Sequence, residues 1–220
     1  MTGKTHRVGG VLCVLGGFTY LESKGLLLNN VSPAIQLLVM YPFAVYGSTF
    51  PDLDHNENAI PSRDIVSVVI NKVLHLSNAE KGPLGLFKAK HRSWQTHSDL
   101  FFALSLALMW HVLKLPQVGY SAEKAILMLV GLGFSLGLVS HMLLDMLTPE
   151  GLWSLLFIGI GKIFSFLKSI LPRKIRLVPY TKFFYTGGKW ESFVRTVLWV
   201  LSIILLVRIV YILSPYEIVF

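Results

Sequence analysis

Long apolar segments alternate with polar connections along the whole chain of 220 residues. Five of these segments have a length close to the roughly 20 residues that a helix needs to cross a bilayer. They cover residues 7–28, 31–50, 100–115, 125–147 and 193–213. The third is the shortest, and as a helix it would span about 24 Å of a hydrocarbon core about 30 Å thick. The pattern therefore predicts an all-α, polytopic integral membrane protein in which residues 1–220 form a single helical domain.

A further apolar segment, residues 152–171, is interrupted by glycines and lysines. The positive-inside rule helps to place it, because cytoplasmic connections carry most of the Lys and Arg residues. With five spans and a cytoplasmic N-terminus, residues 1–7, 51–99 and 148–195 hold 16 of the 20 Lys and Arg residues. An additional span would move the basic run 173–176 to the other side of the membrane. We therefore predict an interfacial or re-entrant helix that lies over the inner leaflet.

Composition agrees with a membrane protein. Hydrophobic residues make up 53% of the chain and charged residues 15%, whereas a soluble domain usually carries about 25% charge. Topology and contact with anionic inner-leaflet lipids explain the net charge of +8, so no nucleic-acid partner is expected. The candidate chemistry lies within residues 1–151, while residues 152–220 hold a basic amphipathic region and the last span.

Ionisable side chains near the ends of the apolar segments need an explanation, because charge is costly at membrane depth. Four groups occur, at the starts of the first and third segments and at the ends of the second and fourth. They are His6; Asp52, Asp54 and His55; His91, Arg92 and His97; and His141 with Asp145. Since odd segments begin and even segments end on the same side, all four groups are expected at the cytoplasmic membrane face.

The histidines and aspartates of these groups are candidate metal ligands. His141 and Asp145 are four residues apart, which places both on one face of a helix. Imidazole and carboxylate together suit zinc, with manganese or iron as alternatives. Three or four ligands saturate one divalent ion, so the set could hold one to three ions. The predicted ligands are His6, Asp52, Asp54, His55, His91, His97, His141 and Asp145.

Sites with several His and Asp ligands typically activate water and clamp a phosphoryl or acyl oxygen. In this interpretation Asp52 or Asp54 bridges metal ions or acts as general base, and Arg92 binds an anionic substrate oxygen. Each residue also has a structural interpretation. Asp52 or Asp54 could form a turn or cap after Pro51, and His141 could be an intrahelical hydrogen-bonding group. The gathering of so many such residues at one face favours a site.

Three of these motifs, together with His6, carry a resemblance to a known family. Residues 51–55 (PDLDH), 91–98 (HRSWQTHS) and 141–151 (HMLLDMLTPEG) resemble the YdjM-type family of membrane-bound metal-dependent hydrolases. The resemblance implies an inner-membrane protein and a distant relation to zinc-dependent phospholipase C and P1-type nucleases, whose His-x-x-x-Asp/Glu signature is matched by His141 and Asp145. Those enzymes also use an N-terminal Trp ligand, for which the start Met1-Thr2 offers no counterpart.

Three functions from different classes follow. The leading hypothesis is hydrolysis of a phosphoester or related ester bond in a membrane lipid or a lipid-linked molecule. A metal or proton-coupled transporter is the second, since intramembrane His and Asp can relay ions, although here they cluster at one end of the bundle. The third is a membrane-anchored interaction or remodelling protein with a structural metal site and with residues 51–99 as its partner surface.

Overall fold

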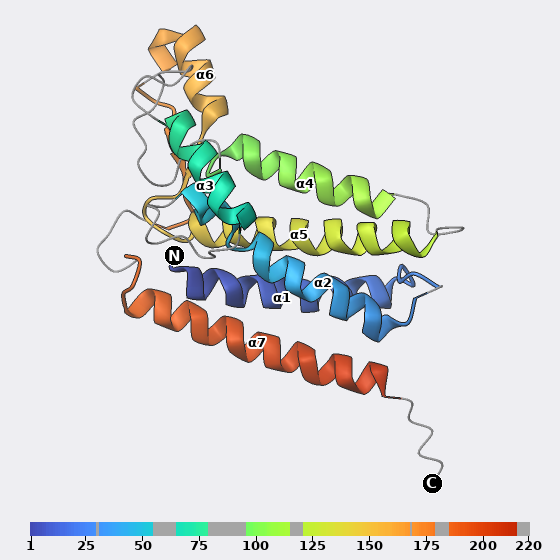
Figure 1. Ribbon diagram of the computed structural model, residues 1–220. Coiled ribbons are helices and arrows are strands. Elements are labelled where there is room, and N and C mark those ends of the chain that lie inside the picture. The colour runs from blue at the N-terminus through green and yellow to red at the C-terminus, as the bar shows by residue number, and fades with distance from the viewer. Residues whose placement is uncertain are drawn as a thin grey trace.

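The computed structural model describes residues 1–29, 31–54, 65–78, 96–114, 121–167, 169–178 and 185–214, and these residues are mostly helical. Five long helices lie side by side in a bundle (Figure 1). They are α1 (Gly3–Ser23), α2 (Pro33–Gly47), α4 (Asp99–Lys114), α5 (Ala122–Met146) and α7 (Lys189–Leu213). These helices correspond one to one with the five predicted apolar segments, with boundaries that differ by a few residues.

Helix α5 lies at the centre of the bundle and packs against α1, α2 and α4. Helix α1 also packs against α2 and α7, so that α4 and α7 lie on opposite outer sides (Figure 1). The main apolar core lies where α1, α2 and α5 meet, and it contains the fully buried side chains Phe18 and Met40. Helices α1 and α5, which carry His6, His141 and Asp145, therefore contribute to this core.

The starts of α2 and α5 follow ordinary capping chemistry. Ser32 precedes α2 and its side chain accepts a hydrogen bond from the backbone N–H of Ile35, while Pro33 takes the first helical position. Ser121 caps α5 in the same way by accepting from the N–H of Lys124. These caps fix where each helix begins, and hence which residues reach the opposite end of the bundle.

Glycine sets the distance between α2 and α5. A Cβ atom on Gly133 would collide with the backbone carbonyl of Met40, and one on Gly137 with the carbonyl of Ala44. Small residues one turn apart are a common means of bringing two membrane helices into close contact. His141 follows Gly137 by one further turn, so it lies on the same face of α5 and points toward α2.

The connection between α2 and α4 contains elements that the sequence pattern did not predict. The 3-10 helix η1 (Phe50–Asp54) follows α2, and the amphipathic helix α3 (Ile65–Asn78) packs against η1. The buried side-chain amide of Asn71 donates a hydrogen bond to the carbonyl of Leu53. This bond ties α3 to the segment that carries Asp52.

Residues 152–171 do not form one continuous helix. Strands β1 (Leu152–Trp153) and β2 (Lys174–Ile175) pair in an antiparallel hairpin that encloses α6 (Leu155–Ile163) and η2 (Ser165–Leu167). Nine residues of α6 span about 13 Å, which is too short to cross a bilayer alone. Figure 1 shows α6 pointing away from the bundle axis, at the end where α1 begins. The position of α6 over the inner leaflet stays a prediction.

Two helices among the described residues are long and apolar enough to cross a bilayer by length and composition. They are the α5 segment Glu123–Met146 and α7. About 56% of the apolar stretch of α5 is buried inside the protein, against 11% of that of α7. Helix α7 therefore turns most of its apolar surface outward, while the prediction of five spans stays a prediction.

Candidate metal centre

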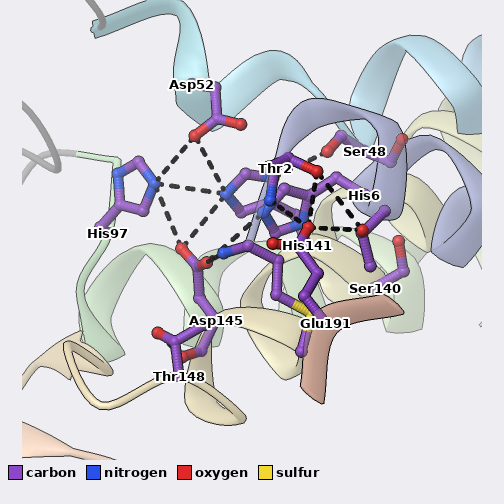
Figure 2. Close-up of polar contacts among 12 residues, drawn as sticks. Thr2, His6, Ser48, Asp52, His97, Ser140, His141, Asp145, Thr148 and Glu191 are labelled. Carbon is purple, nitrogen blue, oxygen red and sulfur yellow. Dashed lines mark hydrogen bonds and ion pairs between the residues drawn. The ribbon is translucent and has the colours of Figure 1, made fainter. Parts of the chain in front are cut away.

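His141 lies near the C-terminal end of α5, and the contact with α2 fixes its orientation. Its Nδ1 atom lies 2.7 Å from the carbonyl oxygen of Ser48, the residue that ends α2. A carbonyl oxygen can only accept, so Nδ1 carries the proton and donates it in this bond. The lone pair is then on Nε2, which points into the polar cluster (Figure 2). A second hydrogen bond that fixes the tautomer in this way is a usual feature of metal-binding histidines.

Asp145 lies one turn after His141 and is also fully buried. Its Oδ2 atom lies 3.3 Å from Nε2 of His141 and 3.3 Å from Nε2 of His97. Its Oδ1 atom lies 3.2 Å from the amino group of Met1 and 3.4 Å from Nε2 of His6. One carboxylate thus contacts partners from two other segments of the chain, the start of α1 and the segment before α4 (Figure 2).

His97 reaches the cluster from the segment just before α4. The backbone N–H of Trp153 in β1 donates a 2.7 Å hydrogen bond to the carbonyl of His97. The ring Nδ1 lies 3.0 Å from the Thr96 hydroxyl, and Nε2 lies 3.2 Å from Nε2 of His141. Because the His141 Nε2 carries no proton, two ring nitrogens at this distance need one shared proton or cation between them.

Three atoms form a nearly equilateral triangle, namely Nε2 of His97, Nε2 of His141 and Oδ2 of Asp145. Its sides measure 3.2, 3.3 and 3.3 Å. In a tetrahedral zinc site the ligand atoms lie about 2.0–2.1 Å from the ion, which places neighbouring ligand atoms about 3.3 Å apart. The three side chains therefore have the spacing of one face of a tetrahedral site.

Asp52, in η1, stands next to this triangle. Its Oδ1 atom lies 3.6 Å from Nε2 of His97 and 3.8 Å from Nε2 of His141. Burial raises the pKa of the Asp52 carboxyl, but the electrostatic influence of the neighbouring His141 ring and the hydrogen bond to His97 outweigh burial and hold this pKa well below its usual range. Its side chain is 11% exposed, whereas those of His97, His141 and Asp145 are fully buried. Asp52 is therefore an ionised carboxylate on the more open side of the cluster.

His6, in the first turns of α1, completes the cluster. Its ring stacks on that of His141 with a centroid distance of 3.7 Å and an interplanar angle of 14°. Its side chain is fully buried, and its ring nitrogens form no well-aligned hydrogen bond with a described residue, although Nε2 lies 3.4 Å from Oδ1 of Asp145. Burying an imidazole in this way is costly, because its contacts with water are only partly replaced. A ligand for His6 would remove that cost.

The donor set accordingly fits a divalent cation. One ligand atom each from His6, Asp52 and His141 lie within 4.8 Å of one another, and the same holds for His97, His141 and Asp145. The buried cluster could therefore hold a metal ion, and His141 belongs to both groups. Neutral imidazole with carboxylate in a tetrahedral arrangement is typical of zinc sites, although manganese and iron accept the same ligand types.

Glu191, in the first turn of α7, supports the cluster from the opposite side of α1. Its Oε1 atom accepts hydrogen bonds from the backbone N–H of Thr2 and from the hydroxyls of Thr2 and Thr5, at 2.5–2.6 Å. Its Oε2 atom accepts from the N–H of Gly187 at 2.6 Å. Sequence reasoning did not identify Glu191, although a carboxylate at the head of an apolar helix was a visible signal.

Five of the predicted ligands come together as expected: His6, Asp52, His97, His141 and Asp145. The backbone of Asp54 ends η1 next to Asp52, and its side chain is not described. His55, His91 and Arg92 lie outside the described residues, so their assigned roles stay predictions.

Comparisons with known proteins identify the family. The family model described as YdjM inner membrane protein matches residues 1–215, and the chain belongs to this family. No curated protein and no solved structure matches the chain. The family is thus the one predicted from the motifs, and the distant likeness to zinc-dependent phospholipase C and P1-type nucleases stays a prediction.

Proposed function

We propose that the protein is a metal-dependent hydrolase that cleaves a phosphoester or related ester bond in a membrane lipid or a lipid-linked molecule at the inner membrane face. The observation that carries this proposal is the triangle of His97, His141 and Asp145 atoms with tetrahedral ligand spacing. Helix packing alone does not explain these three residues, because burying three adjacent polar side chains costs free energy and adds no apolar contacts to the core.

His97, His141 and Asp145 would hold the ion, with Asp52 or His6 as a further ligand. A bound divalent ion of this type supplies Lewis-acid activation of water and of a phosphoryl or acyl oxygen. The protein contributes a fixed geometry, since the Ser48 carbonyl orients His141 and the Thr96 hydroxyl contacts the second ring nitrogen of His97.

Asp52 is the residue best placed to receive a proton from an attacking water. It lies on the more open side of the cluster, and its longer distances of 3.6 and 3.8 Å leave it less tightly held than the other three side chains. Its carboxylate is ionised at neutral pH and can orient a water molecule by accepting a hydrogen bond. Asp54 remains the alternative general base, and Arg92 the proposed contact for an anionic substrate oxygen.

The surroundings of the cluster support a substrate in the membrane. Exposed apolar side chains lie in α6 (Leu156 and Ile163), in η2 (Phe166) and shortly after η2 (Ile170). The basic run 173–176 follows directly. A short helix with exposed apolar side chains and adjacent basic residues is typical of segments that lie in the headgroup region of an anionic leaflet. Such a contact would bring lipid headgroups to the end of the bundle that carries the cluster.

The test is hydrolysis of bis-p-nitrophenyl phosphate and of phospholipid vesicles by the detergent-purified protein after addition of zinc, manganese or iron. We expect activity that His141→Ala and Asp52→Asn abolish. His111→Ala is the matched control, since His111 lies near the opposite end of α4. Phe166→Asp should reduce turnover of vesicles and leave the soluble substrate unaffected. Full activity of the His141→Ala variant would contradict the proposal.

A structural metal site is the second candidate, because the side chains of His97, His141 and Asp145 have no exposed area. Catalytic sites keep one coordination position open, whereas structural sites are closed. In that case metal removal would lower the unfolding temperature, and no substrate would be turned over under any metal condition. The Asp52→Asn variant separates the two functions, since a closed site would lose affinity and a catalytic site would lose turnover.

A further inference from the structure

We propose that a groove between α1, α2 and α7 binds one acyl chain of a bilayer lipid. The further statement that this lipid is the one presented to the cluster rests on the proposed function. Helix α1 packs against both α2 and α7 and forms the floor between them. The groove has a volume of about 370 Å³, within the usual range of small-molecule sites. Residues on its floor and two walls include Val11, Leu15, Leu38, Tyr41, Ile203 and Leu206.

The side chains that line the groove favour a hydrocarbon ligand. None of the residues that line the groove carries a charge. The hydroxyl of Ser202, buried at the groove, donates its hydrogen bond to the carbonyl of Leu198 at 2.8 Å and is therefore satisfied within α7. A peptide or a headgroup placed there would lose its hydrogen bonds with water and gain few in exchange. A saturated or unsaturated chain would lose nothing of this kind.

The groove is continuous with a surface that already faces hydrocarbon. Only 11% of the apolar stretch of α7 is buried, and Trp199, Ile203 and Leu206 on the groove are each about half exposed. Since α7 is long and apolar enough to cross a bilayer and the chain belongs to an inner membrane family, lipid tails surround this face. An acyl chain is expected to fill a groove in such a face, because the side chains that line an empty groove would lose van der Waals contacts.

The groove also lies at the membrane depth that the acyl chain of a lipid would occupy. Val11 follows His6 by five residues, or about 7 Å along the axis of α1. From there the lining continues along α7 to Leu213, away from the cluster. A lipid whose headgroup stands at the end of the bundle that carries the cluster would therefore extend its tail into the groove.

The experiment uses the full-length protein in nanodiscs of phosphatidylethanolamine and phosphatidylglycerol in equal amounts. The probe is phosphatidylglycerol with a photoreactive diazirine in the middle of one acyl chain, and mass spectrometry maps the labelled residues. We expect label to concentrate on Trp199 and Ile203, in preference to the more exposed Val207 outside the groove. Ala34→Trp fills the rim of the groove and should lower that label about tenfold, the effect of excluding roughly two methylene groups.

Val207→Trp is the control of equal bulk on α7 and should leave the pattern unchanged. Ser202→Leu offers a second way to fill the groove should Ala34→Trp fail to fold. Label spread evenly over α7, or unaffected by either filling variant, would overturn the proposal, as would cross-links showing a second copy of the chain seated on the groove. Labelling without hydrolysis would reject the proposed function and keep the groove, whereas hydrolysis without labelling would reject the groove alone.

Discussion

Gly137 and His141 lie one turn apart on the face of α5 that meets α2, and the close helix approach at Gly137 allows His141 to form its hydrogen bond with α2. A Cβ atom on Gly137 would collide with the carbonyl of Ala44, so only glycine allows the two helices to approach this closely. At that separation Nδ1 of His141 reaches the carbonyl of Ser48 at 2.7 Å. Helix packing therefore sets the tautomer and direction of a candidate ligand.

Gly137→Ala tests this relationship. We expect a loss of about 1–3 kcal/mol of stability from overpacking, larger than the gain of up to about 1 kcal/mol that alanine brings to a helix. Metal affinity should fall as well, because His141 loses its hydrogen bond. Gly159→Ala is the matched control, since a Cβ atom on Gly159 in α6 meets open space. Thermal unfolding and metal titration measure both effects, and equal behaviour of the two variants would contradict the relationship.

Glu191→Gln tests whether Glu191 holds the start of α1 in place. The amide keeps one oxygen but cannot accept from all four donors, which come from Thr2, Thr5 and Gly187. We expect a loss of about 1.5–3 kcal/mol in stability, and a fall of about 10–100-fold in metal affinity because His6 follows Thr5 directly. Glu123→Gln, at the exposed start of α5, is the control. A stable variant with unchanged metal affinity would show that Glu191 does not position the cluster.

Metal binding should weaken as the pH falls. Imidazole binds an ion only when neutral, so protons compete increasingly with the ion for the histidine ligands as the pH falls. Asp52 has a lowered pKa and stays ionised while the histidines take up protons, so the aspartate contributes nothing to the loss. Isothermal titration with zinc at several pH values gives the profile. A flat profile would exclude histidine ligands, and Asp52→Asn should leave the midpoint of the profile unchanged.

Much of the arrangement could be predicted from the sequence, because alternation of direction in a helical bundle is a strong constraint. His6, Asp52, His97, His141 and Asp145 meet since each lies at the same end of its segment. The spacing of His141 and Asp145 likewise places both on one face of a helix, whatever the helix packs against. Neither inference needs contacts between residues distant in sequence.

Other features depend on such contacts and could not be predicted. The hydrogen bond that β1 makes to His97, and the docking of Glu191 on the start of α1, join residues more than fifty positions apart. Helix α3 was missed because its apolar residues lie in a stretch that is polar on average. The pair Gly133 and Gly137 was a usable signal for close packing of α5, and it points along one face directly to His141.

The presence of a metal ion is the central claim, and elemental analysis of the detergent-purified protein tests it most directly. We expect a stoichiometric divalent metal, zinc foremost, in the wild-type protein and its loss in His141→Ala, while His111→Ala keeps the full content. Wild-type protein that holds no metal, even after zinc, manganese and iron are added back in turn, would contradict the claim.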